Sequence, residues 1–401
     1  MRRFDYKAKE KKTGKLVKGS IQAENEQTAG RLLIEQGYIP ETISDEGTGI
    51  LGKQSRVSNK DRITFTRQLA TLIGAGLPLA TSLRTVAEQT QGKGMKIIVE
   101  EILTSVESGK TLHESFSRYP DVFNGVYLAL IQAGETSGTL DLALKRLADQ
   151  EEKDAAMMSK IRGALVYPAI ILVVIIAVLA FMMIMVVPHV KDLYADMNQD
   201  LPTLTKILTA ISDFFGNFWW LVIMVVGGIV AGVVYAVKHT PTGRKVMDTF
   251  KISVPIFGGL FRKLYVSRFA RTCEMMLATG VPMLDSVRIS INAVNNVVVE
   301  EEYDKAIDII KGGKPLSEAF RDREYMLPLV PQMASIGEES GKIDEMLGKA
   351  AQVYETELDE QINNISTMIE PILMVIMAAL IGVVVGGTLL PIYSLVNNVT
   401  V

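Results

Sequence analysis

Three long apolar runs interrupt an otherwise mixed pattern of polar and apolar positions. They cover residues 164–187, 214–237 and 371–396, and none of them contains a charged side chain. A helix of about 24 residues is about 36 Å long, whereas the hydrocarbon core of a bilayer is about 30 Å thick. Buried helices of soluble proteins are usually shorter and amphipathic. The pattern therefore predicts three membrane-spanning helices.

Outside these runs the apolar positions follow the period of a helix. In the region before the first run they fall on one helical face in four successive series. The series are Phe65, Leu69, Leu72, Ile73 and Gly76; Leu79, Leu83, Val86 and Ala87; Ile98, Ile102 and Val106; and Leu140, Leu144, Leu147 and Ala148. This spacing predicts about six short helices that pack as a bundle.

The N-terminal region follows a different pattern. Apolar and polar residues alternate over residues 4–9, and residues 17–23 predict a second strand that returns beside the first. Asn25 is placed to cap the helix that follows. We therefore expect a small module of a β-hairpin and a helix over residues 1–44, and a flexible linker over residues 45–57.

The second half of the chain repeats the first half in the same direction. Residues 65–69 return as residues 269–273, and the match continues over unlike residue types. The matched pairs include Gly76 with Gly280, Pro78 with Pro282, Ser82 with Ser286, Gly109 with Gly313, Phe116 with Phe320, Pro168 with Pro371, and Pro188 with Pro391. So many matches indicate a duplication. Each copy holds a helical bundle followed by one span, and the middle span brings the chain back.

The charges beside the spans predict their direction. Basic residues precede the first span and follow the second, whereas the short region between these spans is acidic. The basic flanks consist of Lys153, Lys160, Arg162, Lys238, Arg244, Lys245 and Lys251. Because basic flanks stay in the cytoplasm, we expect residues 1–163 and 238–361 there and the C-terminus outside. The N-terminus has no apolar core of a signal peptide, so it is expected to stay in the cytoplasm.

These patterns together predict an all-α membrane protein with two duplicated cytoplasmic helical bundles, three transmembrane helices and a small N-terminal module. The expected boundaries are 58–163 for the first bundle, 164–187 for the first span, 188–213 for a loop outside, 214–237 for the second span, 238–361 for the second bundle and 371–396 for the third span.

Composition excludes several classes of protein. Hydrophobic residues make up 48% of the 401 residues and charged residues 22%, which excludes a disordered chain and a collagen. The mean hydropathy of +0.23 averages the spans with ordinary regions. A net charge of −3 indicates no basic surface for nucleic acid. The single cysteine, Cys273, excludes an intrachain disulfide and is expected to be a small buried side chain.

One motif resembles the end of a phosphate-binding loop. Residues 108–111 read Ser-Gly-Lys-Thr, but Thr104 stands where that loop needs a glycine, and the preceding segment is helical in pattern. The second copy has Pro315 in place of the hydroxyl residue. A membrane-bound enzyme that uses Lys110 is therefore one hypothesis, and a turn that ends a helix is the preferred interpretation.

The sequence predicts no metal, cofactor or catalytic site. The histidines His113, His189 and His239 do not have the spacing of a zinc hydrolase, and no Ser/His/Asp constellation can be assembled. One acidic cluster either binds a divalent cation or forms a solvated helix face; it consists of Glu151, Glu152 and Asp154.

The spans contain almost no ionisable residues, whereas a transporter would usually place some at mid-membrane depth. A small transporter or channel remains the alternative function. Two pairs of glycines spaced by four residues predict close packing of helices in the membrane. These glycines are Gly228, Gly232, Gly382 and Gly386.

Several motifs occur together over nearly the whole chain. Both copies contain Gly-Glu-x-Ser-Gly, at Gly134, Glu135, Ser137 and Gly138 and at Gly337, Glu338, Ser340 and Gly341. The span entries and exits are marked by Pro168, Pro188, Glu370, Pro371 and Pro391. With the Phe-x-Tyr-x-Ala start and the Leu-Pro-Thr-Leu-Thr loop, the chain resembles the inner-membrane platform proteins of type IV pilus and type II secretion systems (PilC and GspF). The second copy departs from the first at residues 322–327.

The resemblance implies a non-enzymatic adaptor without a cofactor in the bacterial inner membrane. Family members dock their cytoplasmic bundles in a hexameric assembly or retraction ATPase, whose movement drives pilin or pseudopilin subunits into a filament. The other implied partners are inner-membrane alignment proteins, a second copy of the chain in a homodimer and the lipid bilayer, but not nucleic acid. The Gly-Glu-x-Ser-Gly positions are expected to be structural turns. Pilus assembly, DNA uptake and protein secretion all remain open.

Overall fold

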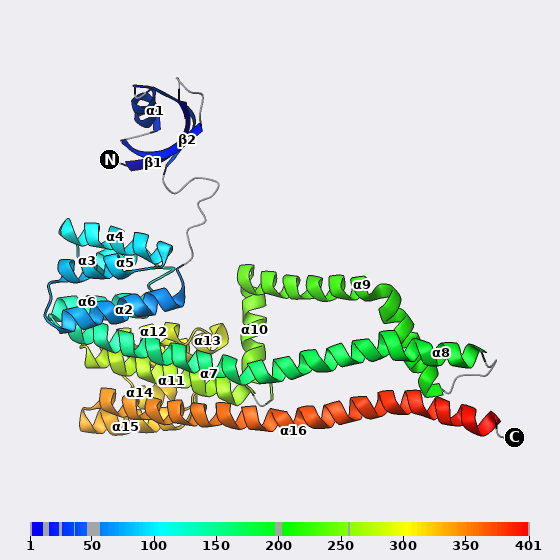
Figure 1. Ribbon diagram of the computed structural model, residues 1–401. Coiled ribbons are helices and arrows are strands. Elements are labelled where there is room, and N and C mark those ends of the chain that lie inside the picture. Colours follow the sequence, from blue (N-terminus) through cyan, green and yellow to red (C-terminus); the bar gives the residue numbers. More distant parts are fainter. Residues whose placement is uncertain are drawn as a thin grey trace. The chain divides into compact units, whose positions relative to one another are not determined.

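A computed structural model describes residues 2–10, 16–23, 26–35, 37–45, 57–196, 203–255 and 257–399. They fall into two compact units, whose elements are labelled in Figure 1. The first unit contains Met1–Phe123 and Leu140–Ala148, and the second contains Asn124–Thr139 and Asp149–Val401. The units therefore do not coincide with the two sequence copies, because helix α6 (Gly125–Ser137) of the first copy belongs to the second unit.

A three-stranded antiparallel sheet lies in the N-terminal region. Its order is β2-β1-β3, with β1 at Arg2–Glu10, β2 at Leu16–Ala23 and β3 at Tyr38–Asp45. Helix α1 (Glu26–Glu35) packs on the sheet and buries Ala29 and Leu33. Strand β3 was not predicted from the sequence, because Pro40 lies within it. Proline is tolerated there because β3 is an edge strand. Asn25 and residues 46–56 of the predicted linker lie outside the described residues.

Four helices of the first unit precede α6 in the chain. They are α2 (Asn59–Gly74), α3 (Leu79–Gln89), α4 (Lys93–Glu107) and α5 (Leu112–Ser117). Three buried rings meet in their core. The Phe116 and Phe123 rings stack with centroids 4.4 Å apart, and the Phe65 ring lies 6.1 Å from each. Such aromatic pairs contribute about 0.5–1.5 kcal/mol beyond the burial of their area.

The second unit has a core of the same kind. Its helices include α10 (Pro241–Ser253), α11 (Phe257–Ala278), α12 (Met283–Ala293), α13 (Val297–Lys311), α14 (Leu316–Phe320) and α15 (Leu329–Ser340). Phe269 lies 4.8 Å from Phe320 and 5.4 Å from Tyr303, ring centre to ring centre. Phe269 and Phe320 occupy the repeat positions of Phe65 and Phe116. The duplication therefore preserves two rings of the trio and replaces the third.

The three predicted spans are confirmed as helices that are long and apolar enough to cross a membrane. The first is α7 (Leu140–Phe181), the second α9 (Thr203–His239) and the third α16 (Ile343–Val399). Helices α7 and α16 each begin well before their apolar run, with Pro168 inside α7 and Pro371 and Pro391 inside α16. Bundle and span are therefore joined by uninterrupted helix in both copies.

The predicted loop over residues 188–213 is largely helical. The α7 helix passes through a π-helical segment (Met182–Val186, η1) into α8 (Val187–Asp196). Pro188 has no amide hydrogen, so the regular helical ladder is interrupted there. The π turn meets this interruption: the Val187 amide donates to the Met182 carbonyl, five residues back. Helix α8 lies at the end of the first span, and we call this end of the spans the far end.

Cys273 provides a test of the second core. Its side chain is fully buried, and burial raises the pKa of the Cys273 thiol to about 12. The thiolate is the reactive form, and at pH 8 a thiol with this pKa is ionised in about one molecule in ten thousand. We expect N-ethylmaleimide to leave Cys273 unmodified in the folded full-length chain and to modify it completely after denaturation, as measured by mass spectrometry. Rapid modification of the folded chain would show that this core is open.

Candidate functional site

The Gly-Glu-x-Ser-Gly motif of the second copy ends α15 and starts α16. Gly341 has a φ of 72°, the left-handed conformation that glycine adopts readily. The Lys342 amide donates to the Gly337 carbonyl at 2.9 Å, which is the hydrogen bond expected at such a helix end. The Ser340 hydroxyl donates to the Ile336 carbonyl at 2.7 Å. The motif therefore stops one helix and reverses the chain into the next.

Gly337 lets these two helices approach closely. A methyl group at this position would lie 2.6 Å from the Cα of Ile343 and 3.1 Å from its amide nitrogen. Both are backbone atoms at the first turn of α16, so neither can move aside without shifting the helix. Gly337 is consequently required by the packing of α15 on the start of α16.

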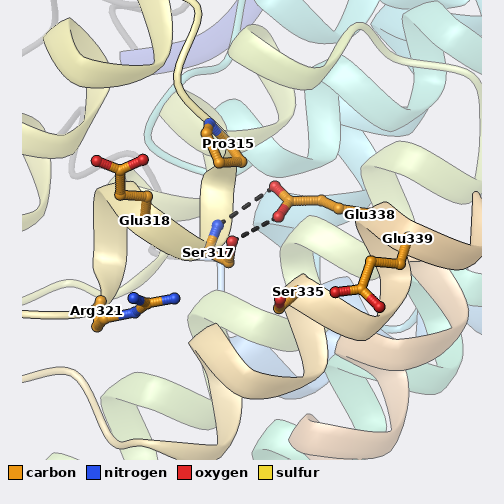
Figure 2. A pocket seen from close by; sticks show the side chains of 7 residues that line it. All are labelled: Pro315, Ser317, Glu318, Arg321, Ser335, Glu338 and Glu339. Carbon is orange, nitrogen blue, oxygen red and sulfur yellow. Dashed lines mark hydrogen bonds between the residues drawn. The ribbon is translucent and has the colours of Figure 1, made fainter.

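Glu338 connects the motif to a third helix. Its carboxylate accepts a hydrogen bond from the Ser317 hydroxyl at 2.6 Å and another from the Ser317 amide at 3.3 Å (Figure 2). Ser317 lies in the first turn of α14, where Pro315 supplies no side-chain cap. Because the first amides of a helix lack partners within that helix, Glu338 supplies the missing acceptor. It holds α14 against α15.

A shallow hollow surrounds this contact (Figure 2). It is lined by Pro315, Ser317, Glu318, Arg321, Ser335, Glu338 and Glu339. The lining combines three carboxylates with one guanidinium. Within the described part of the chain, no group of three or more His, Cys, Asp or Glu side chains is placed to hold a metal ion. The arrangement can hold helices in place, and the Glu338 carboxylate does so through its hydrogen bonds with Ser317.

The first copy has the same helix stop. Gly138 has a φ of 75° at the end of α6. The Ser137 hydroxyl donates to the Ala133 carbonyl at 2.7 Å, as Ser340 does in the second copy. Gly134 is buried. Glycine and serine therefore perform the same local task in both copies.

The Ser-Gly-Lys-Thr motif is likewise a helix stop. Gly109 has a φ of 90° just after α4, and the Lys110 amide donates to the Ser105 carbonyl at 3.2 Å. The Thr111 side chain then accepts the Glu114 amide at 3.1 Å and caps α5. The repeat position Gly313 has a φ of 86°. A phosphate-binding loop would follow a strand, whereas this turn joins two helices.

A set of ion pairs joins the helices that lead into the first and third spans. Lys160 on α7 lies 2.6 Å from Asp359 on α16, and Lys153 lies 3.9 Å from Glu355. Nearby on α7, the apolar side chains of Met157, Ile161 and Ala164 pack against the second core. We call this contact the ionic seam. The ionic seam joins residues 153–164 of α7 to α16 within the second unit.

Arg271 on α11 is part of the same seam. Its guanidinium donates two hydrogen bonds to the Glu355 carboxylate, at 2.9 and 3.0 Å. Burial alone would lower the pKa of Arg271, but the hydrogen bonds and charge of Glu355, together with those of Glu274, outweigh it and raise the pKa. Arg268 on the same helix lies 3.9 Å from Asp154 of the acidic cluster on α7. Asp154 of this cluster therefore takes part in the pairing of α7 with α11.

Within the described part of the chain, the glycine pairs in the spans have open space around them. A methyl group at Gly228, Gly232, Gly382 or Gly386 would meet no atom within 4 Å. Their predicted role in helix packing stays a prediction. Of the histidines, His189 contacts the Met185 carbonyl with Nδ1 at 2.6 Å, and the His239 ring stacks on Tyr235. Each contact is with a residue one helical turn before the histidine. Glu370 is an exposed position within α16.

Comparison with known proteins agrees with the duplicated architecture. The family model for type II secretion system protein F matches residues 65–188 and again residues 269–391. The chain belongs to the type II secretion system protein F family. The model for the N-terminal domain of this family matches residues 1–44. The inferred duplication is therefore confirmed, since one family domain occurs twice.

Relatives of known role extend over nearly the full chain. The type IV pilus assembly protein PilC of Thermus thermophilus is 34% identical over 408 residues, which cover 99% of both chains. PilC of Pseudomonas aeruginosa is 35% identical and covers 92% of this chain and 98% of its own. The type II secretion system protein F of Vibrio cholerae is 32% identical and covers 99% of both. The family thus includes pilus and secretion proteins.

The contacts of Ser317 and of the seam residues Arg271 and Glu355 were not predicted from the sequence. Arg271 recurs in the first copy as Arg67, so both copies carry an arginine at this repeat position. This repeated charge is the feature of the sequence that could have identified Arg271. The partner of Arg271 was not predictable, because Glu355 is distant in sequence and is one of several acidic residues in its helix.

We expect Glu338→Ala to lower the thermal midpoint of the purified full-length chain. The substitution leaves the Ser317 amide and hydroxyl without their acceptor, a loss of about 1–3 kcal/mol. Differential scanning fluorimetry of the detergent-solubilised protein measures it. Glu339→Ala is the matched control, because Glu339 is exposed and next in sequence. Equal midpoints for the two variants would contradict the role of Glu338.

Gly337→Ala tests the close approach of α15 and α16. The added methyl group overlaps the backbone of Ile343, so we expect a destabilisation of about 1–3 kcal/mol. The readout is again the thermal midpoint. Gly125→Ala is the control, because a methyl group there meets no atom within 4 Å. A Gly337→Ala variant as stable as the control would show that the helices are not tightly packed.

Proposed function

We propose that this chain is the inner-membrane platform of a type IV pilus or type II secretion machine. The observation that carries the proposal is its similarity, over nearly the full length, to proteins named for pilus assembly and for type II secretion. In this role it couples a cytoplasmic motor ATPase to the insertion of pilin or pseudopilin subunits into a filament. Its other partners are inner-membrane alignment proteins and a second copy of the chain.

The proposed orientation follows from the charges beside the spans. The basic residues before the first span and after the second favour the cytoplasm on that side. The N-terminus and the two bundles, of about six helices each, then lie in the cytoplasm, and the C-terminus lies outside. The far end, which includes the acidic region of residues 188–213, faces outward.

The helices suit a mechanical role. Helix α16 is continuous from Ile343, at the Gly-Glu-x-Ser-Gly turn, to Val399. A force on the second bundle therefore reaches the membrane along one helix and not through a flexible joint. The ionic seam couples α7 to the same helix. We infer that the chain moves as a linked pair of helices and performs no catalysis of its own.

A deletion strain without a second copy of the gene tests the proposal. We expect loss of surface pili or of secretion, and restoration by the full-length gene. Lys110→Ala is expected to restore the function as well, because Lys110 belongs to a helix stop. Electron microscopy of pili and an assay of secreted protein measure both outcomes.

Co-purification of the tagged chain with a motor ATPase from the same strain is the second expected result. Normal pili and normal secretion in the deletion strain would overturn the proposal. So would solute flux through the purified chain in liposomes, because a platform needs no conducting path.

A further inference from the structure

The α9 helix changes direction before its span begins. Phe218 has a φ of −118° and a ψ of 19°, outside the helical range, and Figure 1 shows α9 turning sharply near α8. After this kink, residues 219–237 give about 28 Å of uncharged helix, close to the thickness of a bilayer core of about 30 Å. Residues 203–217, which we call the leading segment, are therefore not needed to cross the membrane.

One face of the leading segment packs against the rest of the far end. Thr205, Leu208, Thr209 and Ser212 are buried. The Ser212 hydroxyl donates to the Met183 carbonyl in the π-helical segment. Three of the four buried side chains carry hydroxyl groups, so this face is the reverse of an ordinary amphipathic helix, which turns its apolar side toward the protein.

The apolar side of the leading segment points away from the protein. Exposed fractions are 55% for Ile207, 39% for Ile211, 48% for Phe214 and 43% for Phe215. At about 100° per residue these positions fall on one side of the helix. We call them the apolar stripe. A contiguous patch of this kind marks a surface that something apolar covers.

The remaining side of the leading segment is charged. Lys206 and Asp213 lie there, and Asp213 forms an exposed ion pair of 2.8 Å with Lys191 on α8. The segment thus has a face toward the protein, a face toward water and a face that is apolar and uncovered. A helix with opposed charged and apolar faces is suited to the plane of a membrane surface.

Three observations indicate that lipid covers the apolar stripe. The apolar stripe is continuous along α9 with the exposed apolar side chains of the span. Trp219 and Trp220, directly after the kink, are 60% and 49% exposed, and tryptophan is enriched at the boundary between lipid and water. The charged face marks the side toward water. We propose that the leading segment is an interfacial helix, with its apolar stripe immersed in the bilayer boundary at the far end.

Such a helix fixes the depth of α9 in the bilayer. Movement of α9 along the membrane normal would draw the stripe into water or Lys206 and Asp213 into the hydrocarbon, and each is unfavourable. The contact of Ser212 with Met183 extends this restraint to the first span. The proposal depends on α9 crossing a membrane and does not depend on a motor ATPase or a filament.

Site-specific fluorescence in liposomes tests the proposal on the full-length chain. We would label Ile211→Cys on the stripe and Lys206→Cys on the charged face with the same environment-sensitive dye. The unsubstituted chain is the background control, because Cys273 is buried. Phe214→Cys is a second stripe position if Ile211→Cys does not fold. The emission of Trp219 and Trp220, the only two tryptophans, reports folding at the kink.

The measurements are quenching by aqueous iodide and by lipids that carry a nitroxide near the headgroup. We expect iodide to quench the stripe label at least threefold less than the Lys206 label, and the nitroxide lipids to quench the stripe label more strongly. Equal quenching of both labels by iodide would place the stripe in water and overturn the proposal. A stripe label shielded from both quenchers would show that protein covers it, such as a second copy, and would equally overturn it.

Discussion

A backbone polar group without a hydrogen-bond partner is costly in the hydrocarbon core of a bilayer. The architecture of this chain depends on that constraint, since its spans must carry their hydrogen bonds within themselves. Helices α7 and α16 meet it within their apolar runs, and each continues without a break from a bundle into its span. This continuity also produces a stiff connection, so each helix can transmit a displacement between bundle and membrane.

The constraint is hardest to meet at proline, and the chain treats its prolines in different ways. Pro168 is accommodated inside α7. Before Pro188 the helix widens into a π turn, and the Ser212 hydroxyl of α9 binds the Met183 carbonyl in that turn. A local defect in one span is thereby satisfied by a side chain of the next. The far end is consequently a packed structure and not a simple loop, and it orients the leading segment of α9.

The duplication repeats local turns more faithfully than it repeats tertiary contacts. Gly138 and Gly341 end their helices in the same left-handed conformation, and a serine before each bonds one turn back. The compact units nevertheless divide the two copies differently. Helices α5 and α6 of the first copy belong to different units, whereas their counterparts α14 and α15 both belong to the second unit. Helix stops depend on neighbouring residues alone and so survive duplication. Packing depends on every surface in contact and has diverged.

The sequence alone determined the three spans, the helical character of the bundles, the duplication and the positions of the helix stops. Each of these follows from periodicity, length or a glycine with a local conformational task. The sequence did not reveal the edge strand β3, which contains Pro40. It also did not reveal the helical structure of the far end or the partners of Glu338 and Arg271. Only the tertiary structure decided these, because Ser317 and Glu355 meet their partners through packing of helices distant in sequence. Apolar spacing specifies which face of a helix is buried, but not which charged residue on another helix lies opposite.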